Sequence, residues 1–126
     1  MSVPGGLAHV VTRREQNLAR KMKALIEVTE DLRSVLLAYK RVSAQVVERV
    51  EKGHTLVAAL EALRGPIRRR AVTEAVENFE GARHAVRVAM FALGQENGTS
   101  ASELGRQLGI SRQLSARLAK EAEELA

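Results

Sequence analysis

The chain contains no cysteine, and only 2% of its residues are aromatic, namely Tyr39, Phe79 and Phe91. The absence of cysteine excludes disulfides and thiolate metal sites. Because aromatic rings are so few, the core must be built from aliphatic side chains, which favours helices packed on helices over a sheet sandwich. The only prolines are Pro4 and Pro66. The composition therefore predicts an all-α fold.

Long apolar runs are also missing. No stretch approaches the roughly 18 consecutive apolar residues of a membrane span, and no basic start followed by an apolar run opens the sequence. The 126 residues are 45% hydrophobic, which is enough for the core of one domain, or of one small domain with an extension. We expect a soluble cytoplasmic protein.

The charge is moderately basic and unevenly spread. Lys and Arg number 20 against 15 Asp and Glu, a net charge of +5 that suits an anionic partner. Residues 1–52 carry 10 basic and 6 acidic side chains, whereas residues 99–126 carry 4 of each. Any affinity of the C-terminal segment for phosphate must therefore come from the orientation of its cations.

One long helix is predicted for the N-terminal part. Thr12 and Glu15 have the spacing of a capping box, and no Gly or Pro follows before Gly53. Within this helix, spacings of four and three define a heptad seam, which Val28, Val35 and Val42 widen on one flank. The seam residues are Leu18, Met22, Leu25, Thr29, Leu32, Leu36, Tyr39, Ser43, Val46 and Val50.

The predicted helix is about 60 Å long, whereas a compact domain of this size is roughly 35 Å across. Two covers for the seam are possible. The same helix of a second copy can pack on it, which Thr29 and Ser43 favour because they resemble polar positions that set the register of a coiled coil. Alternatively, helices from residues 55–95 fold back along it. We expect the dimer.

Glycines divide the rest of the chain. Gly53 ends the long helix, Thr55 caps a short helix over residues 56–64, and a third helix starts with Pro66 in its first turn and runs through Leu93. Gly81 inside this third helix is expected to be a close-packing point or a kink. The predicted divisions are a dimerisation helix at residues 1–54, connecting helices at 55–81 and a C-terminal unit at 82–126.

The last stretch, residues 99–126, reads as two short helices joined by a glycine turn. Ser100 and Glu103 form a capping-box pair for a helix that starts at Ala101, and Gly109 ends that helix. Ser111 can cap a second helix. Its apolar residues recur at helical spacing and are Leu114, Leu118, Ala122 and Leu125.

This stretch resembles a helix-turn-helix DNA-binding unit. Gly105 matches the small residue in the middle of the family's first helix, Gly109 its turn glycine and Ile110 the apolar residue that follows. The family usually has an apolar residue five positions after that one, where this chain has Ser115. The resemblance implies that residues 82–93 form the first helix of a trihelical unit, and no wing is expected after it.

The resemblance implies a sequence-specific DNA-binding protein, a transcriptional regulator whose C-terminal helix enters the major groove of double-stranded DNA. The long N-terminal helix would make it a dimer. The residues expected near base edges are Arg112, Gln113, Ala116 and Arg117. Those expected on phosphates are Ser111, Arg106 and Lys120.

Two further basic clusters need a partner or solvent. Arg68, Arg69 and Arg70 are expected in the first turn of a helix, where the helix dipole disfavours cations, so DNA phosphate is one candidate partner. The alternative is an ion pair of Arg70 with Glu74 and solvation of the others. The second cluster comprises Arg13, Arg14, Arg20, Lys21 and Lys23, and we expect it to be a solvated helix face.

No catalytic or metal site is predicted. His9, His54 and His84 are far apart and have no carboxylate at ligand spacing, and no phosphate-binding loop or serine elbow is present. We expect neither a cofactor nor an enzyme. The rival to DNA binding is a helical scaffold or interaction module, in which the two terminal helices only cap a bundle. Convergence of the four C-terminal cations on a face free of glutamates would favour DNA.

Overall fold

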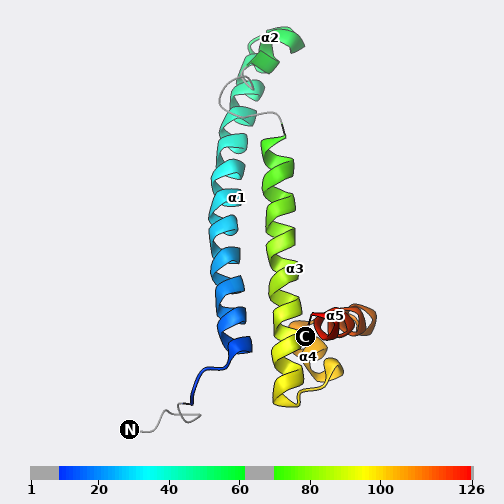
Figure 1. Cartoon of the computed structure of the whole chain (residues 1–126). Coiled ribbons are helices and arrows are strands. Elements are labelled where there is room, and N and C mark those ends of the chain that lie inside the picture. Colours follow the sequence, from blue (N-terminus) through cyan, green and yellow to red (C-terminus); the bar gives the residue numbers. More distant parts are fainter. Residues whose placement is uncertain (1–8, 62–69, 126) are drawn as a thin grey trace. The chain divides into compact units, whose positions relative to one another are not determined.

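The computed structural model describes residues 9–61 and 70–125, and every regular element in that part of the chain is an α-helix. The all-α prediction is confirmed. In chain order the helices are α1 (Arg13–Glu51), α2 (Leu56–Leu60), α3 (Ala71–Asn97), α4 (Ala101–Leu108) and α5 (Arg112–Glu124) (Figure 1).

The chain folds into two compact units, and the boundaries between them lie inside α1 and inside α3. Unit 1 combines the residues up to Lys23 with His84–Ala126, and unit 2 is Ala24–Arg83. The second segment of unit 1 begins at His84, inside α3. The first turns of α1 belong to that same unit, which the sequence division at residue 54 does not anticipate.

The predicted capping box at the start of α1 is formed in both directions. The Thr12 backbone N–H donates to Glu15 Oε1 at 2.8 Å, and the Glu15 backbone N–H donates to Thr12 Oγ1 at 3.2 Å. Hydrogen bonding from the Thr12 backbone N–H, with a smaller contribution from His9, holds the pKa of the Glu15 carboxyl below its ordinary value of 4.5.

Acidification is expected to loosen the first turn of α1. Because the pKa of Glu15 is lower in the folded chain, its contribution to stability is full above pH 4.5 and is lost as the pH falls through the folded value. A carbon-13 NMR titration of the Glu15 carboxyl checks this, and a midpoint at or above 4.5 would contradict it. In the control Glu15→Gln, the Thr12 amide shift should lose its acid titration.

In unit 2, α1 and α3 lie side by side, and each contributes one buried apolar side chain (Figure 1). Among the described residues of this unit, the buried apolar side chains are those of Val42, Ala59 and Ala75. The covered side of α1 centres on Val42 with the half-buried Val28 and Val35, which the sequence places on the flank of the seam. Folding back within the chain therefore covers part of the seam.

An adjacent side of α1 in unit 2 carries exposed apolar side chains. We call this set the exposed strip; it consists of Ile26, Leu36, Leu37, Tyr39, Val47 and Val50. Leu36, Tyr39 and Val50 belong to the predicted seam, and all six lie on one side of a helix with 3.6 residues per turn. Part of the seam is thus available to a further partner.

Two expectations for the middle of the chain are corrected, and one of the two alternatives for Gly81 is excluded. α2 ends at Leu60, not at residue 64. α3 begins at Ala71, because Arg70 has a left-handed φ of 69° that a helix cannot contain; Pro66 lies outside the described residues. At Gly81 the helix is continuous, and a Cβ would meet nothing within 4 Å, so Gly81 is not a close-packing point.

Unit 1 holds most of the buried apolar side chains of the described residues. Val88 and Phe91 of α3 are buried against Leu118 and Ala122 of α5. Half-buried apolar side chains of α3, α4, α5 and the turn between α4 and α5 surround this cluster. They are Ala92, Ala101, Leu104, Leu108, Ile110, Leu114 and Ala119. The C-terminal part of α3 therefore forms one core with α4 and α5.

Candidate nucleic-acid interface

α4 and α5 cross in direct contact at Gly105. A Cβ built on Gly105 would overlap Ser115 Oγ and would lie 3.1 Å from Ser115 Cβ, which is closer than side chains normally approach one another. The glycine is therefore required by the approach of the two helices, not by its backbone angles. The small residue at position 105 thus allows the close crossing.

Ser115 is the inward-facing partner in this crossing, with 3% of its surface exposed. Its hydroxyl donates to the Ser111 carbonyl at 2.8 Å, so the buried polar group is satisfied inside its own helix. A serine is thus accommodated at the position where the helix-turn-helix family usually has an apolar residue. Its small volume complements the missing side chain at Gly105.

The turn between α4 and α5 is made by Gly109, Ile110 and Ser111. Gly109 has a φ of 68°, and the N–H groups of Ile110 and Gly109 donate to the carbonyls of Gly105 and Arg106 at 3.0 and 3.2 Å. This bonding pattern is the Schellman motif, which ends a helix at a left-handed residue. Ser111 Oγ then accepts from the Leu114 N–H at 3.1 Å and starts α5.

α5 is also fastened to α3 by polar contacts. Gln95 Nε2 donates to the Ala119 carbonyl at 3.0 Å, and His84 Nε2 lies 2.6 Å from Glu121 Oε2. Together with the apolar core, these two contacts fix the orientation of α5 against α3. The remaining side faces solvent.

The residues predicted near base edges all lie on that solvent-facing side. Arg112, Gln113, Ala116 and Arg117 are exposed, as are Ser111 and Lys120, which are predicted on phosphates. Within the described part of the chain, Arg112, Arg117 and Lys120 form no ion pair. Three uncompensated cations therefore extend from the first turn to the third turn of α5.

The acidic residues of the segment are distributed along the helices and not simply opposite these cations. Glu121 turns toward His84 of α3, whereas Glu123 and Glu124 are exposed in the last turn of α5. On α4, the Arg106 guanidinium pairs with the Glu103 carboxylate, which makes that part of the surface neutral. The basic surface is thus limited to the first three turns of α5.

The arginine run is only partly described. Arg68 and Arg69 lie outside the described residues. Arg70 precedes α3 instead of lying in its first turn, and its guanidinium is 3.8 Å from the Glu77 carboxylate. Arg70 therefore lies at the N-terminal end of α3, with a carboxylate of the same chain beside it.

One packing position is not predicted by the sequence. Gly94 of α3 is buried, and a Cβ there would lie 3.3 Å from Leu104 Cδ2 of α4. In the sequence, Gly94 is only a glycine among apolar residues near the end of a predicted helix. Such a glycine can either end the helix or allow another helix to pack closely, and the sequence does not distinguish the two. Gly94 allows α4 to pack closely on α3.

Among the described residues, no helix is long and apolar enough to cross a membrane. The same residues contain no group of three His, Asp or Glu side chains that could hold a metal ion. Comparisons of the chain with protein-family models, with curated proteins and with solved structures gave no match.

Proposed function

We propose that the chain is a sequence-specific DNA-binding protein, acting as a dimeric transcriptional regulator whose α5 enters the major groove. The observation that carries the proposal is the close crossing of α4 and α5 at Gly105 and Ser115, with a left-handed turn at Gly109. This arrangement leaves the first turns of α5 exposed, and the N-terminal end of a recognition helix is the part that approaches base edges.

The exposed side chains at this end of α5 suit base reading. Arg112 can donate two hydrogen bonds to a guanine, and Gln113 can form a paired hydrogen bond with an adenine. Arg112 and Arg117 are five residues apart, so they point about 140° away from one another. Both reach bases only if the groove wraps around the helix, as the major groove does.

Phosphate contacts would set the position of the helix on the duplex. The Ser111 hydroxyl accepts from the Leu114 N–H and retains its own proton to donate to a phosphate oxygen. Lys120 is exposed and unpaired within the described part of the chain. Arg106 has to exchange its Glu103 partner for phosphate, so its contribution is expected to be the smallest of the three.

The second candidate function is a non-enzymatic interaction module. It is favoured by the Glu103 and Arg106 ion pair and by the exposed Glu123 and Glu124, which lower the positive charge of the surface. A selection from random DNA duplexes with the full chain distinguishes the two functions. Enrichment of one motif supports DNA reading, and no enrichment supports the interaction module.

Arg112→Ala is expected to weaken binding to the selected duplex by about 1 to 3 kcal/mol and to change binding to an unrelated duplex little. The reason is that a base contact exists only on the preferred sequence. Fluorescence anisotropy on both duplexes at one salt concentration measures the difference.

The matched control is Lys120→Ala, which removes one cation from the same helix. It should weaken both duplexes about equally and reduce the slope of log K against log salt by about 0.9, the value for one phosphate contact. If the circular dichroism of Arg112→Ala is normal and the preferred duplex is bound as before, Arg112 does not read bases.

A further inference from the structure

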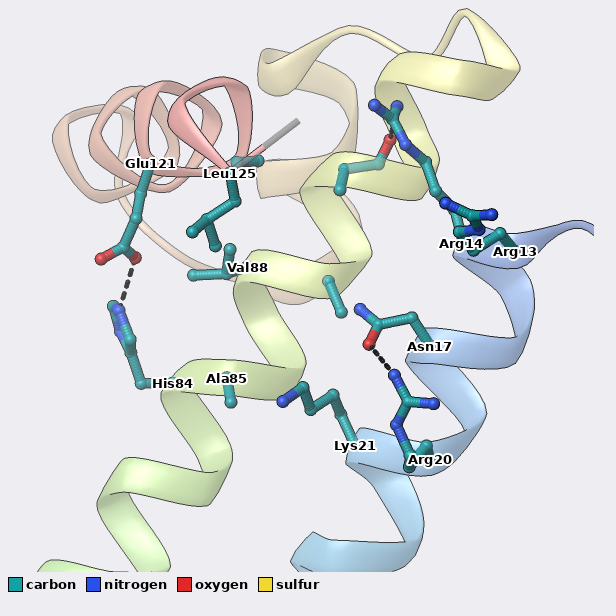
Figure 2. Close-up of a pocket in the computed structure, with 13 residues that line it drawn as sticks. Arg13, Arg14, Asn17, Arg20, Lys21, His84, Ala85, Val88, Glu121 and Leu125 are labelled. Atoms are coloured by element: carbon teal, nitrogen blue, oxygen red, sulfur yellow. Dashed lines mark hydrogen bonds and ion pairs between the residues drawn. The ribbon is translucent and has the colours of Figure 1, made fainter.

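A pocket of about 640 Å³ lies within unit 1, between the first turns of α1, the middle of α3 and the last turns of α5 (Figure 2). Its floor consists of small apolar side chains of α3, among them Ala85, Val88 and Ala89. Leu125, the residue that follows α5, extends over this floor (Figure 2). Volume and floor fall within the range of pockets that bind small organic molecules.

The α1 wall of the pocket is cationic. It contains Arg13, Arg14, Arg20 and Lys21, and Figure 2 shows Lys21 reaching across the pocket toward the α3 floor. The sequence suggested a solvated helix face here, and that expectation is wrong for two members. Arg14 and Lys21 are half-buried, because the end of α3 packs beside the start of α1.

None of these four cations pairs with a carboxylate in the described part of the chain. Arg14 donates to the Ala92 carbonyl at 2.8 Å, and Arg20 donates to the Asn17 side-chain oxygen at 2.8 Å, both neutral acceptors. The one carboxylate that lines the pocket, Glu121, is engaged by His84 on the far side (Figure 2). Partly desolvated cations without an anion favour an anionic ligand.

We propose that this pocket binds a small amphipathic organic anion. Its carboxylate or phosphate group lies among the cations of α1, and its apolar part lies on the alanine and valine floor of α3. The site does not depend on DNA binding, since it uses none of the residues expected on DNA. It does contact Glu121, Ala122 and Leu125, so the ligand touches the end of the helix proposed to read bases.

Four probes separate the two halves of this ligand. Octanoate and octyl phosphate carry both an anionic head and an apolar tail, octanol carries only the tail and acetate only the head. Isothermal titration of the full chain should show one site for at least one of the two amphipathic anions, with a dissociation constant below about 1 mM. The comparison of the two anions identifies the preferred head group. Octanol and acetate should each bind at least tenfold more weakly.

Variants on one helix locate the site. Lys21→Glu should weaken binding at least tenfold, because it replaces a charge-assisted contact with repulsion. Lys23→Glu is the matched control, since Lys23 is exposed two residues away and does not line the pocket; it should change binding less than twofold. Arg13→Glu is a second variant of the pocket wall. Arg13 is exposed and lies in the first turn of α1, where the helix dipole favours an acidic side chain, so the fold should tolerate the change. It should weaken binding as Lys21→Glu does.

Several results would overturn the proposal. If octanol binds as tightly as octanoate and octyl phosphate, the cations play no part in binding. If acetate binds as tightly as the two amphipathic anions, the apolar floor plays no part. Equal effects of Lys21→Glu and Lys23→Glu would remove the pocket as the location. If neither amphipathic anion binds while Lys21→Glu weakens the affinity for duplex DNA, the cluster is a DNA contact instead.

Discussion

Gly105→Ala is expected to destabilise unit 1 by about 1 to 3 kcal/mol and to abolish binding to the preferred duplex. The added Cβ would overlap Ser115 Oγ, and the Ser115 Cβ behind it is only 3.1 Å away, so a change of rotamer at Ser115 does not suffice. α4 and α5 must then move apart. Urea denaturation followed by circular dichroism measures the first effect, and fluorescence anisotropy on the selected duplex measures the second.

The chain offers a matched control in Gly81→Ala. Both glycines lie inside helices, but a Cβ at Gly81 meets nothing within 4 Å, so alanine should raise stability by up to about 1 kcal/mol there. Ser115→Ala added to Gly105→Ala should recover part of the loss, because it removes the nearer of the two clashing atoms. Equal, stabilising effects of the two glycine substitutions would contradict the close crossing.

The full chain is expected to sediment as a dimer at micromolar concentration, and Leu36→Asp is expected to weaken that dimer at least 100-fold. Leu36 lies in the middle of the exposed strip, with 45% of its surface accessible in the single chain. A symmetric interface contains the substituted residue twice, so two charges would enter apolar surroundings. Analytical ultracentrifugation over a concentration series measures the change.

Two neighbouring substitutions separate association from folding. Ser34→Asp places the same charge on an exposed polar position of α1 and should leave the dimer intact. Leu32→Asp affects a half-buried seam residue that is covered within the chain, so it should reduce helicity as well as association. A wild-type chain that sediments as a monomer at micromolar concentration would rule out the dimer and leave α3 as the cover of α1.

The predictable part of the fold consists of helix ends. Thr12, Ser100 and Ser111 cap the helices that their sequence context indicates, and Gly53 and Gly109 follow the helices they were expected to end. These outcomes depend on hydrogen bonds between residues three to five positions apart. Such contacts are encoded by local spacing, so one sequence suffices to predict them.

The candidate interface was predictable to a similar degree. The exposed positions on α5 follow from the period of its apolar residues, and Gly105 and Gly109 follow from the resemblance. The burial of Ser115 was not predictable, because a serine does not contribute to a pattern of apolar residues. Its inward orientation is decided by the space that Gly105 leaves on another helix, which no pattern within α5 can show.

By itself, the sequence determined that the described chain is helical, where α1 and α4 begin and end, where α5 begins, and which positions of α5 face solvent. The tertiary structure alone decided which side of α1 is covered within the chain, because α1 carries apolar residues on two adjacent sides. It also decided that the N-terminal cations line a pocket: Arg14 meets the Ala92 carbonyl 78 positions along the chain. Contacts of that range depend on how whole helices pack, and neither spacing nor local charge encodes them.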